Sequence, residues 1–204
     1  MTMAGDDAAP TSTQDTASVL DDLPVLDGER IRLRGFREDD LHDLYAVHSD
    51  PQVMRYWSFP AWTELAQAQD RLANAMSGRD PRRLLCWAIA ERGDDRLVGG
   101  VTLFSIDRAQ GRAEVGYSLR SDRWGRGLAR EALQLALAHA FDGLGLRRVE
   151  ADVDPRNAAS CALVERFGFV REGLLRERWL VAGELQDSAI YGLLARDWRA
   201  RQGG

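Results

Sequence analysis

Hydrophobic and polar residues alternate near the start of the folded part of the chain. In RIRLRGF (30–36), Ile31 and Leu33 are separated by arginines, and this period of two predicts a half-buried strand. The next segment, REDDLHDLYAVHSDP (37–51), carries acidic residues in its first turn and apolar residues at helical spacing, which predicts a helix that stops at Asp50–Pro51. A second helix is predicted from Trp62–Thr63 to about Met76, with Gly78 as its end.

The middle of the chain contains three segments with the pattern of strands. They are LLCWAIAE (84–91), RLVGGVTLFSI (96–106) and RAEVGYSLR (112–120), and the turn-forming RGDD and DRAQG separate them. Short turns of this kind predict antiparallel hairpins. A helix is then predicted from Gly127 to Phe141, because apolar residues recur there at i, i+3, i+4 and i+7.

The last third predicts a strand, a short helix and a hairpin. Val149, Ala151 and Val153 alternate with charged residues in 147–154, and Asn157 is an N-cap candidate for the helix that follows. The segments 173–181 and 185–195 are joined at Ala182–Gly183. The order of elements predicts a mixed α/β (α+β) fold. Its mostly antiparallel sheet has about seven strands, one β-α-β crossover and helices on both faces.

Length and composition narrow the protein class. The chain has 204 residues and a formal net charge of −5, which predicts one globular domain over 25–200 and disfavours a broad nucleic-acid-binding face. Residues 1–24 are rich in Ala, Asp, Thr and Ser and predict a disordered leader. No apolar run is long enough to span a membrane and no signal-peptide pattern is present, so we expect a cytoplasmic protein.

Cysteine and histidine usage argues against a metal site. Cys86 and Cys161 belong to no Cys/His cluster, and we expect both to be reduced and buried, with no metal bound.

The loop SDRWGRG (121–127) precedes the long predicted helix. Main-chain N–H groups at a helix N-terminus lack partners and favour a pyrophosphate. Gly125 and Gly127 would permit close approach, and Arg123, Arg126 and Arg130 could contact phosphate oxygens. The alternative is that the glycines only turn the chain. A P-loop is excluded because no Gly-Lys-Ser/Thr occurs, and a dinucleotide fingerprint fails because Arg130 stands where its third Gly or Ala belongs.

The segment WGRGLA (124–129) resembles the acyl-CoA pyrophosphate loop of the Gcn5-related N-acetyltransferases, or GNAT superfamily. Trp124 replaces a polar first residue, which resembles the ribosomal-protein alanine N-acetyltransferase branch. RIRLRGFREDDL, AEVGYSLR, NAASCALVERFGFVREG and GELQDSAIYGLL resemble that branch in order and spacing. The resemblance covers about Leu26 to Trp198.

The resemblance implies acetyl-CoA as cosubstrate and a GNAT fold in which the fourth and fifth strands splay apart. The pantetheine arm would then lie in the gap and pair with main-chain groups of β-strand residues, while Asn157 holds its amide. The implied acetyl-CoA-binding residues are Tyr117, Ser118, Leu119, Trp124, Gly125, Arg126, Gly127, Leu128, Ala129, Arg130 and Asn157.

The resemblance also implies direct acetyl transfer without a covalent enzyme intermediate. Glu114 corresponds to a position where several relatives hold a general base, although it could be an ordinary strand glutamate. Ser160 matches a serine that protonates the leaving thiolate, although it could only cap a helix. Glu177, or loss of the proton to solvent, remains an alternative to Glu114. Cys161 as a nucleophile has little support, because no histidine is near it in sequence.

The implied acceptor is a primary amine, such as a protein N-terminal α-amine. It would bind near 54–62, an aromatic-rich segment, and near 177–186. A small amine (polyamine, amino sugar or antibiotic) is the alternative substrate, and a non-catalytic acyl-CoA-binding sensor is the alternative from another class. The resemblance is compatible with a homodimer, and no membrane or direct nucleic-acid partner is expected.

Overall fold

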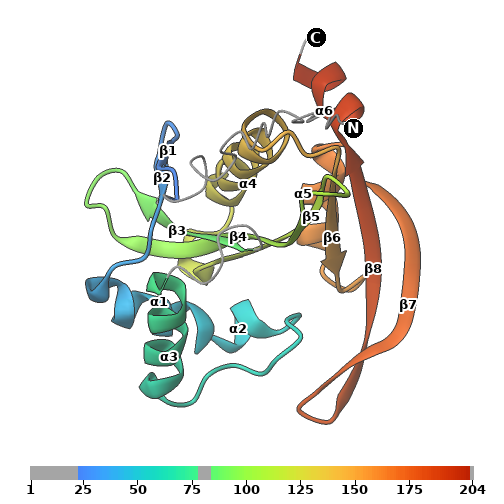
Figure 1. The fold of residues 1–204 in the computed structure, drawn as a ribbon. Coiled ribbons are helices and arrows are strands. Elements are labelled where there is room, and N and C mark those ends of the chain that lie inside the picture. The colour runs from blue at the N-terminus through green and yellow to red at the C-terminus, as the bar shows by residue number, and fades with distance from the viewer. Residues whose placement is uncertain (1–22, 78–83, 203–204) are drawn as a thin grey trace, which may run out of the picture.

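The computed structural model describes residues 23–77 and 84–202, arranged around one eight-stranded sheet (Figure 1). Residues 1–22 of the predicted leader, and Gly78 as a helix end, lie outside the described residues. The strands are β1 (Leu26–Asp27), β2 (Ile31–Arg34), β3 (Leu85–Glu91), β4 (Leu97–Asp107), β5 (Arg112–Leu119), β6 (Arg148–Val153), β7 (Val170–Val181) and β8 (Glu184–Leu194). The α-helices are α1 (Leu41–His48), α2 (Pro51–Met54), α3 (Leu65–Met76), α4 (Leu128–Ala138), α5 (Ala158–Arg166) and α6 (Ala195–Gln202).

The sheet is mixed and mostly antiparallel, as predicted. Its strand order is β1-β2-β3-β4-β5-β6-β8-β7, and only β5 and β6 run parallel. The count of about seven strands was one too low because β1 pairs with β2 through only two residues. A strand of that length has no period of alternation to detect in the sequence.

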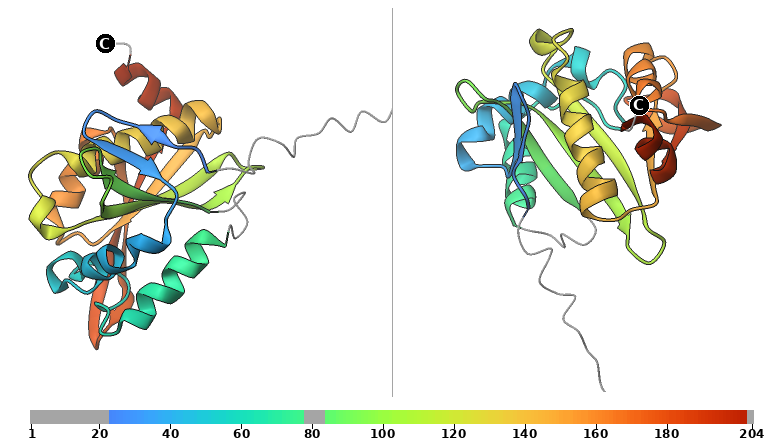
Figure 2. Two further views of the ribbon diagram at one scale, coloured as in Figure 1. Left: turned by 90° about the vertical axis from the view of Figure 1, so that its left-hand side faces the viewer. Right: turned by 90° about the horizontal axis from the view of Figure 1, so that it is seen from above.

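Helices cover both faces of the sheet, which confirms the prediction (Figure 2). On one face, Leu133 and Leu137 of α4 are fully buried with Val149 of β6. On the other, Leu44 of α1 and Leu72 of α3 form a second buried cluster. Among the described helices, none is long and apolar enough to cross a membrane.

Two helices differ from the sequence prediction. Asp50–Pro51 was predicted as a stop, and α1 does end at His48, but Pro51 then begins the short helix α2. The Asp50 side chain accepts a hydrogen bond from the Gln52 N–H at 2.8 Å, so the same dipeptide that ends one helix caps the next. The other helix, α6, directly continues β8 and was not predicted.

The parallel pair of strands separates after three residues. Pairing between β5 and β6 runs from Arg112–Arg148 to Glu114–Glu150. Beyond Glu114, β5 pairs with β4 on one side while β6 pairs with β8 on the other. The edge of residues 115–119 that faces β6 therefore has no strand partner within the described residues. This is the gap that the resemblance implies between the fourth and fifth strands. It lies between β5 and β6 here because the unpredicted strand β1 shifts the numbering by one.

Candidate active site

The glycine loop before α4 has the backbone conformation that its sequence suggested. Gly125 has φ 74° and Gly127, the N-cap of α4, has φ 77°. Residues with a Cβ adopt these left-handed backbone angles only at a cost in free energy. Among the described hydrogen bonds outside helices and strands, none uses the N–H of residues 125–127. The Trp124 N–H donates to the Ser121 carbonyl at 3.2 Å. The run of free amides therefore begins at Gly125, one residue after the start of the segment WGRGLA (124–129).

Two side chains, Arg30 just before β2 and Glu131 of α4, hold this loop from one side. The Arg30 guanidinium donates to the Arg126 carbonyl at 2.6 Å and pairs with Glu131 at 3.0 Å. Glu131 also accepts from the backbone N–H groups of Arg30 and Ile31 at 2.8 and 3.3 Å. Burial would raise the pKa of Glu131, but these donors together lower it below its usual value. A charged Glu131 therefore ties the loop to the start of β2.

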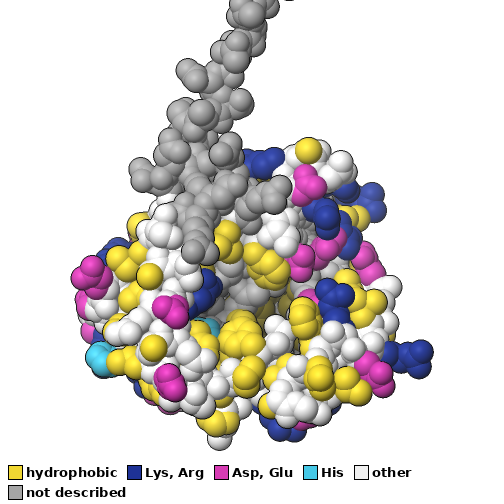
Figure 3. All heavy atoms as spheres, turned by 60° about the horizontal axis from the view of Figure 1, so that its bottom comes forward, with side chains coloured by type: hydrophobic (Ala, Val, Ile, Leu, Met, Phe, Trp, Pro, Cys, Tyr) yellow, Lys and Arg dark blue, Asp and Glu magenta, His cyan; other side chains and the backbone are white. Residues whose placement is uncertain are grey.

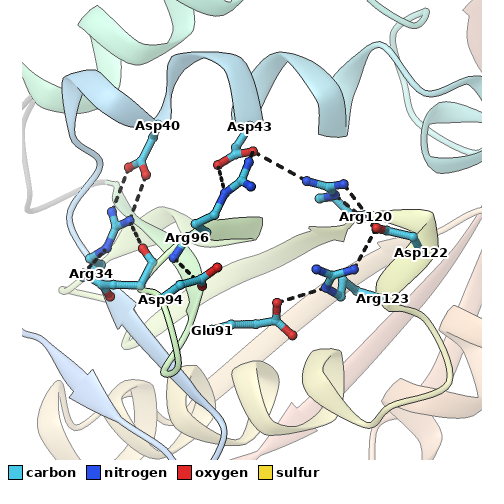
Figure 4. A network of polar contacts seen from close by, with 10 residues as sticks. Arg34, Asp40, Asp43, Glu91, Asp94, Arg96, Arg120, Asp122 and Arg123 are labelled. Atoms are coloured by element: carbon cyan, nitrogen blue, oxygen red, sulfur yellow. Dashed lines mark hydrogen bonds and ion pairs between the residues drawn. The ribbon is translucent and has the colours of Figure 1, made fainter.

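A series of ion pairs holds the loop from the other side (Figure 4). Asp43 of α1 lies 3.5 Å from the Arg120 guanidinium, and Arg120 pairs with Asp122 at 3.1 Å. Arg123 then joins Asp122 at 2.7 Å and Glu91 of β3 at 3.0 Å. Arg123 thus has two carboxylate partners. It was predicted to contact phosphate oxygens, and in the structure it also holds the loop against β3.

A cavity of about 930 Å3 begins at the glycine loop and passes between β5 and α5. Most of the predicted acetyl-CoA-binding residues line it: Tyr117, Ser118, Leu119, Trp124, Gly125, Gly127, Leu128, Ala129, Arg130 and Asn157. Ser160 also lines it, whereas Arg126 and Glu114 do not. The structure therefore brings together residues that are up to 43 positions apart in the sequence.

Tyr117 and Ser160 form a hydroxyl pair inside this cavity, 2.7 Å apart. The Asn157 side-chain oxygen accepts from the Ser160 N–H at 3.1 Å, so Asn157 caps α5, as predicted, and Ser160 does not cap it. Burial raises the pKa of Tyr117 to about 12, which keeps its hydroxyl protonated near neutral pH. Only the main chain of Tyr117 was predicted to bind acetyl-CoA, although strand alternation places its side chain on the face of Ala113 and Val115.

Glu114 is the last β5 residue paired with β6, at the point where the gap begins. Its neighbours Ala113 and Val115 are buried on the α4 face, so alternation directs Glu114 to the opposite face. Glu177 is exposed, has φ 52° in an irregular part of β7, and its N–H donates to Asp187 at 2.8 Å.

The acceptor-side wall comes from the segment around α2. Gln52, Val53, Arg55, Tyr56 and Trp57 line the cavity, which overlaps the predicted segment 54–62 at its start. No residue of 177–186 lines it, contrary to expectation, although Glu184 at the hairpin turn pairs with the lining residue Arg156.

The rest of the aromatic segment packs inward. Trp62 stacks on His48 with ring centroids 4.3 Å apart, and Phe59 lies 6.4 Å from the same ring. Burial lowers the pKa of His48 to about 4, so this histidine is a neutral core residue at neutral pH. In Figure 3, hydrophobic side chains gather around a hollow on this lower face of the molecule.

Residues 30–170 match the family model of the acetyltransferase (GNAT) domain. The chain belongs to the GNAT acetyltransferase family. Over 180 residues it is 35% identical to the uncharacterized N-acetyltransferase p20 of Bacillus licheniformis, covering 86% of this chain and 99% of that one. A GCN5-related N-acetyltransferase from Brucella melitensis has a similar structure, with a TM-score of 0.78 at 26% identity over 90% of this GNAT chain and 84% of the other.

A third comparison concerns ligands. The fold of spermidine N-acetyltransferase from Vibrio cholerae, solved in complex with CoA and spermine, superimposes with a TM-score of 0.74 at 23% identity. It covers 84% of this chain and 99% of the other.

Family membership makes the protein an acyltransferase. The non-catalytic sensor considered from the sequence is therefore set aside, and the ribosomal-protein branch and the homodimer stay predictions. Cys161 is half-buried, not fully buried as expected, and its Sγ lies 3.9 Å from the Asp154 carbonyl. It is not among the cavity-lining residues, whereas its neighbours Ser160 and Ala162 are.

Proposed function

We propose that this GNAT enzyme transfers an acetyl group from acetyl-CoA directly to a primary amine, and that the acceptor is a protein N-terminal α-amine. One observation carries the proposal. A single cavity joins the glycine loop, the unpaired edge of β5 and the Tyr117–Ser160 pair. An elongated thioester with a diphosphate at one end fits such a cavity, because its anionic end and its reacting end need different surroundings.

The residues present fit acetyl-CoA in chemical terms. The free amides of residues 125–127 and the N-terminus of α4 would take the diphosphate, with Arg130 as a cation beside it. Main-chain groups of Tyr117, Ser118 and Leu119 would pair with the pantetheine arm. Asn157 would use its side-chain NH2 for the pantetheine amide, since its side-chain oxygen already accepts from Ser160.

In the transfer step, the amine nitrogen attacks the thioester carbonyl carbon. A C–N bond forms, the C–S bond breaks, and the electron pair of that bond leaves with the sulfur. Fixed placement of the amine and the thioester supplies much of the acceleration. A main-chain N–H on the free edge of β5 would stabilise the negative charge that develops on the carbonyl oxygen.

Two proton transfers accompany this step. Ser160 would donate its hydroxyl proton to the departing thiolate, Tyr117 would return a proton to Ser160 through the 2.7 Å contact, and Tyr117 would regain its own proton from solvent. Glu114 would take the amine proton through water, because it lies at the point where β5 and β6 separate.

The role of Glu114 is tested by the pH–rate profiles of Glu114→Gln and Glu177→Gln. If Glu114 is the base, only the first variant loses the wild-type limb that reports base ionisation. If both variants keep that limb, the proton passes to solvent instead.

The acceptor class is tested by thiol release from acetyl-CoA with a panel of amines. The panel contains a peptide with a free N-terminus, the same peptide with a blocked N-terminus, spermidine and an amino sugar. We expect thiol release with the free peptide, matched by one acetyl group on its α-amine in the mass spectrum, and none with the blocked peptide. Release only with spermidine or the sugar would replace this acceptor with a small amine, and no release with any amine would refute the proposal.

A further inference from the structure

Arginines line the cavity that would hold both substrates: Arg55, Arg123, Arg130, Arg156 and Arg166. Within residues 23–77 and 84–202, no Asp or Glu lines it. Two of these arginines have carboxylate partners outside the lining. Arg123 pairs with Glu91 and Asp122, and Arg156 pairs with Asp154 and Glu184.

The remaining three arginines divide between the two ends of the cavity. Arg130 lies in the first turn of α4 beside the glycine loop, and Arg166 is the last residue of α5. Arg130 is placed for the anionic end of acetyl-CoA, and Arg166 lies at the opposite end of α5 from Ser160. Arg55 follows α2, on the wall opposite the glycine loop helix, and none of the ion pairs among the described residues includes it.

Arg55 is held near the start of α5 by an aromatic ring. Its guanidinium carbon lies 5.7 Å from the centroid of the Tyr56 ring, and that of Arg156 lies 5.9 Å from the same centroid. Arg156 immediately precedes Asn157, whose turn of helix contains Ser160. A guanidinium over a ring keeps its N–H groups available at the edge of its plane. Arg55 is therefore an exposed cation beside this ring, at the end of the cavity where the acceptor would enter.

We infer that Arg55 binds an anionic group of the acceptor, so that the preferred acceptor is an α-amine with a carboxylate nearby. The class is a peptide with an acidic residue next to its N-terminal residue. This inference rests on the proposed function and adds the charge of the substrate to it. A polyamine would bring further positive charge against a guanidinium without any lining carboxylate.

The test compares three peptides, Ala-Glu-Ala-Ala, Ala-Gln-Ala-Ala and Ala-Lys-Ala-Ala, at saturating acetyl-CoA. We expect kcat/KM for thiol release to fall in that order, with about a tenfold difference between Glu and Lys. Arg55→Gln should remove most of the difference, and Arg55→Glu should reverse the order. Arg171→Gln, which removes an exposed arginine on the edge strand β7, is the matched control and should keep the wild-type order.

Free alanine provides a separate arm, because its only anion is its own α-carboxylate. If it is acetylated faster than Ala-Glu-Ala-Ala, and only while Arg55 is present, then Arg55 binds the carboxylate of a free amino acid. That result would keep the anionic acceptor but overturn the peptide.

Other outcomes overturn the inference directly. They are an equal loss for all three peptides in Arg55→Gln, a raised KM for acetyl-CoA in that variant, or a wild-type preference for Lys or for spermidine. Acetylation of the Gln peptide by the wild-type enzyme checks the proposed function separately. If that peptide is acetylated without any preference for Glu, only the inference about Arg55 fails, and if no peptide is acetylated both fail. Thermal melting of each variant establishes that it is folded.

Discussion

The two ends of the cavity are built in different ways. At the glycine loop, free main-chain amides form the surface, and Glu131 on one side and the Asp43-to-Glu91 ion-pair series on the other hold the loop in place. At the acceptor end, side chains from α2, the residues that follow it and the start of α5 form the surface, with Arg55 and Arg156 at one aromatic ring. Glu184 of the β7–β8 hairpin pairs with Arg156 from outside the lining. A backbone surface suits one invariant cosubstrate, whereas a side-chain surface can change with the acceptor.

The largest expected effect lies between the two ends, at Ser160. In the proposed mechanism Ser160→Ala removes the donor to the thiolate, and we expect kcat to fall about 100-fold with little change in the KM for acetyl-CoA. Stopped assays of thiol release measure this. Ser77→Ala, at the exposed end of α3, is the control and should keep full activity.

A change of leaving group makes the Ser160 test specific. An acetyl thioester of a more acidic thiol needs less help from a proton donor, so the defect of Ser160→Ala should shrink with it. An equal defect with both thioesters would mean that Ser160 positions the substrate and does not act as the acid.

The next effect concerns the glycine loop. Gly127→Ala places a Cβ at φ 77°, with the Arg30 Nη2 atom 3.2 Å away, and a left-handed conformation costs an L-residue roughly 1–2 kcal/mol. We expect roughly tenfold weaker binding of CoA by calorimetry, because the loop relaxes away from the geometry that presents its amides. Gly93→Ala, in an exposed turn with no atom within 4 Å of the added Cβ, should bind as the wild type does. Unchanged binding by Gly127→Ala would remove the loop from the cofactor site.

Glu131→Gln tests the support under that loop through stability. Loss of a charged acceptor for Arg30 and Ile31 should lower the free energy of unfolding by about 1 kcal/mol near pH 7. The folded-state pKa of Glu131 lies below its ordinary value of 4.5, so its stabilising contribution is present above that pH and is lost as the pH falls through the folded-state pKa. Denaturant unfolding from pH 7 to 3 should therefore show the two proteins converging. Exposed Glu29 provides the control variant Glu29→Gln, and parallel pH curves would contradict the assignment.

The same contrast explains which features were predictable from the sequence. Helix α4, the glycine loop and the strands other than β1 follow from local periodicity and spacing, and the capping role of Asn157 follows from its place before a helix. These features depend on residues close together in the chain. The side-chain contact between Tyr117 and Ser160 joins residues from two elements, and alternation could have placed Tyr117 on the correct face but not opposite Ser160.

The acceptor end was the least predictable region. In the aromatic segment, Tyr56 and Trp57 line the cavity, while Trp57 also packs with Phe59 and Trp62 in the second buried cluster, and no local pattern distinguishes these roles. Residues 177–186 do not line the cavity, and the hairpin that they belong to is linked to it through the ion pair of Glu184 with Arg156, so binding of the acceptor near them stays a prediction. Hydrophobic spacing contains no signal for such a long-range ion pair.

The smallest expected effect is at that ion pair. The Glu184 side chain is 54% exposed and shares Arg156 with the buried Asp154, so Glu184→Gln should only loosen the placement of Arg156 beside the Tyr56 ring. We expect the KM for the acceptor peptide to rise about twofold to threefold, with kcat and the KM for acetyl-CoA unchanged, and the difference should vanish in high salt because exposed pairs are screened. Glu38→Gln, which removes an exposed glutamate near α1, should leave both constants as they are. A rise in the KM for acetyl-CoA instead would mean that Arg156 contacts the cofactor. The start of α5 would then belong to the acetyl-CoA end of the cavity, and only the segment around α2 would belong to the acceptor end.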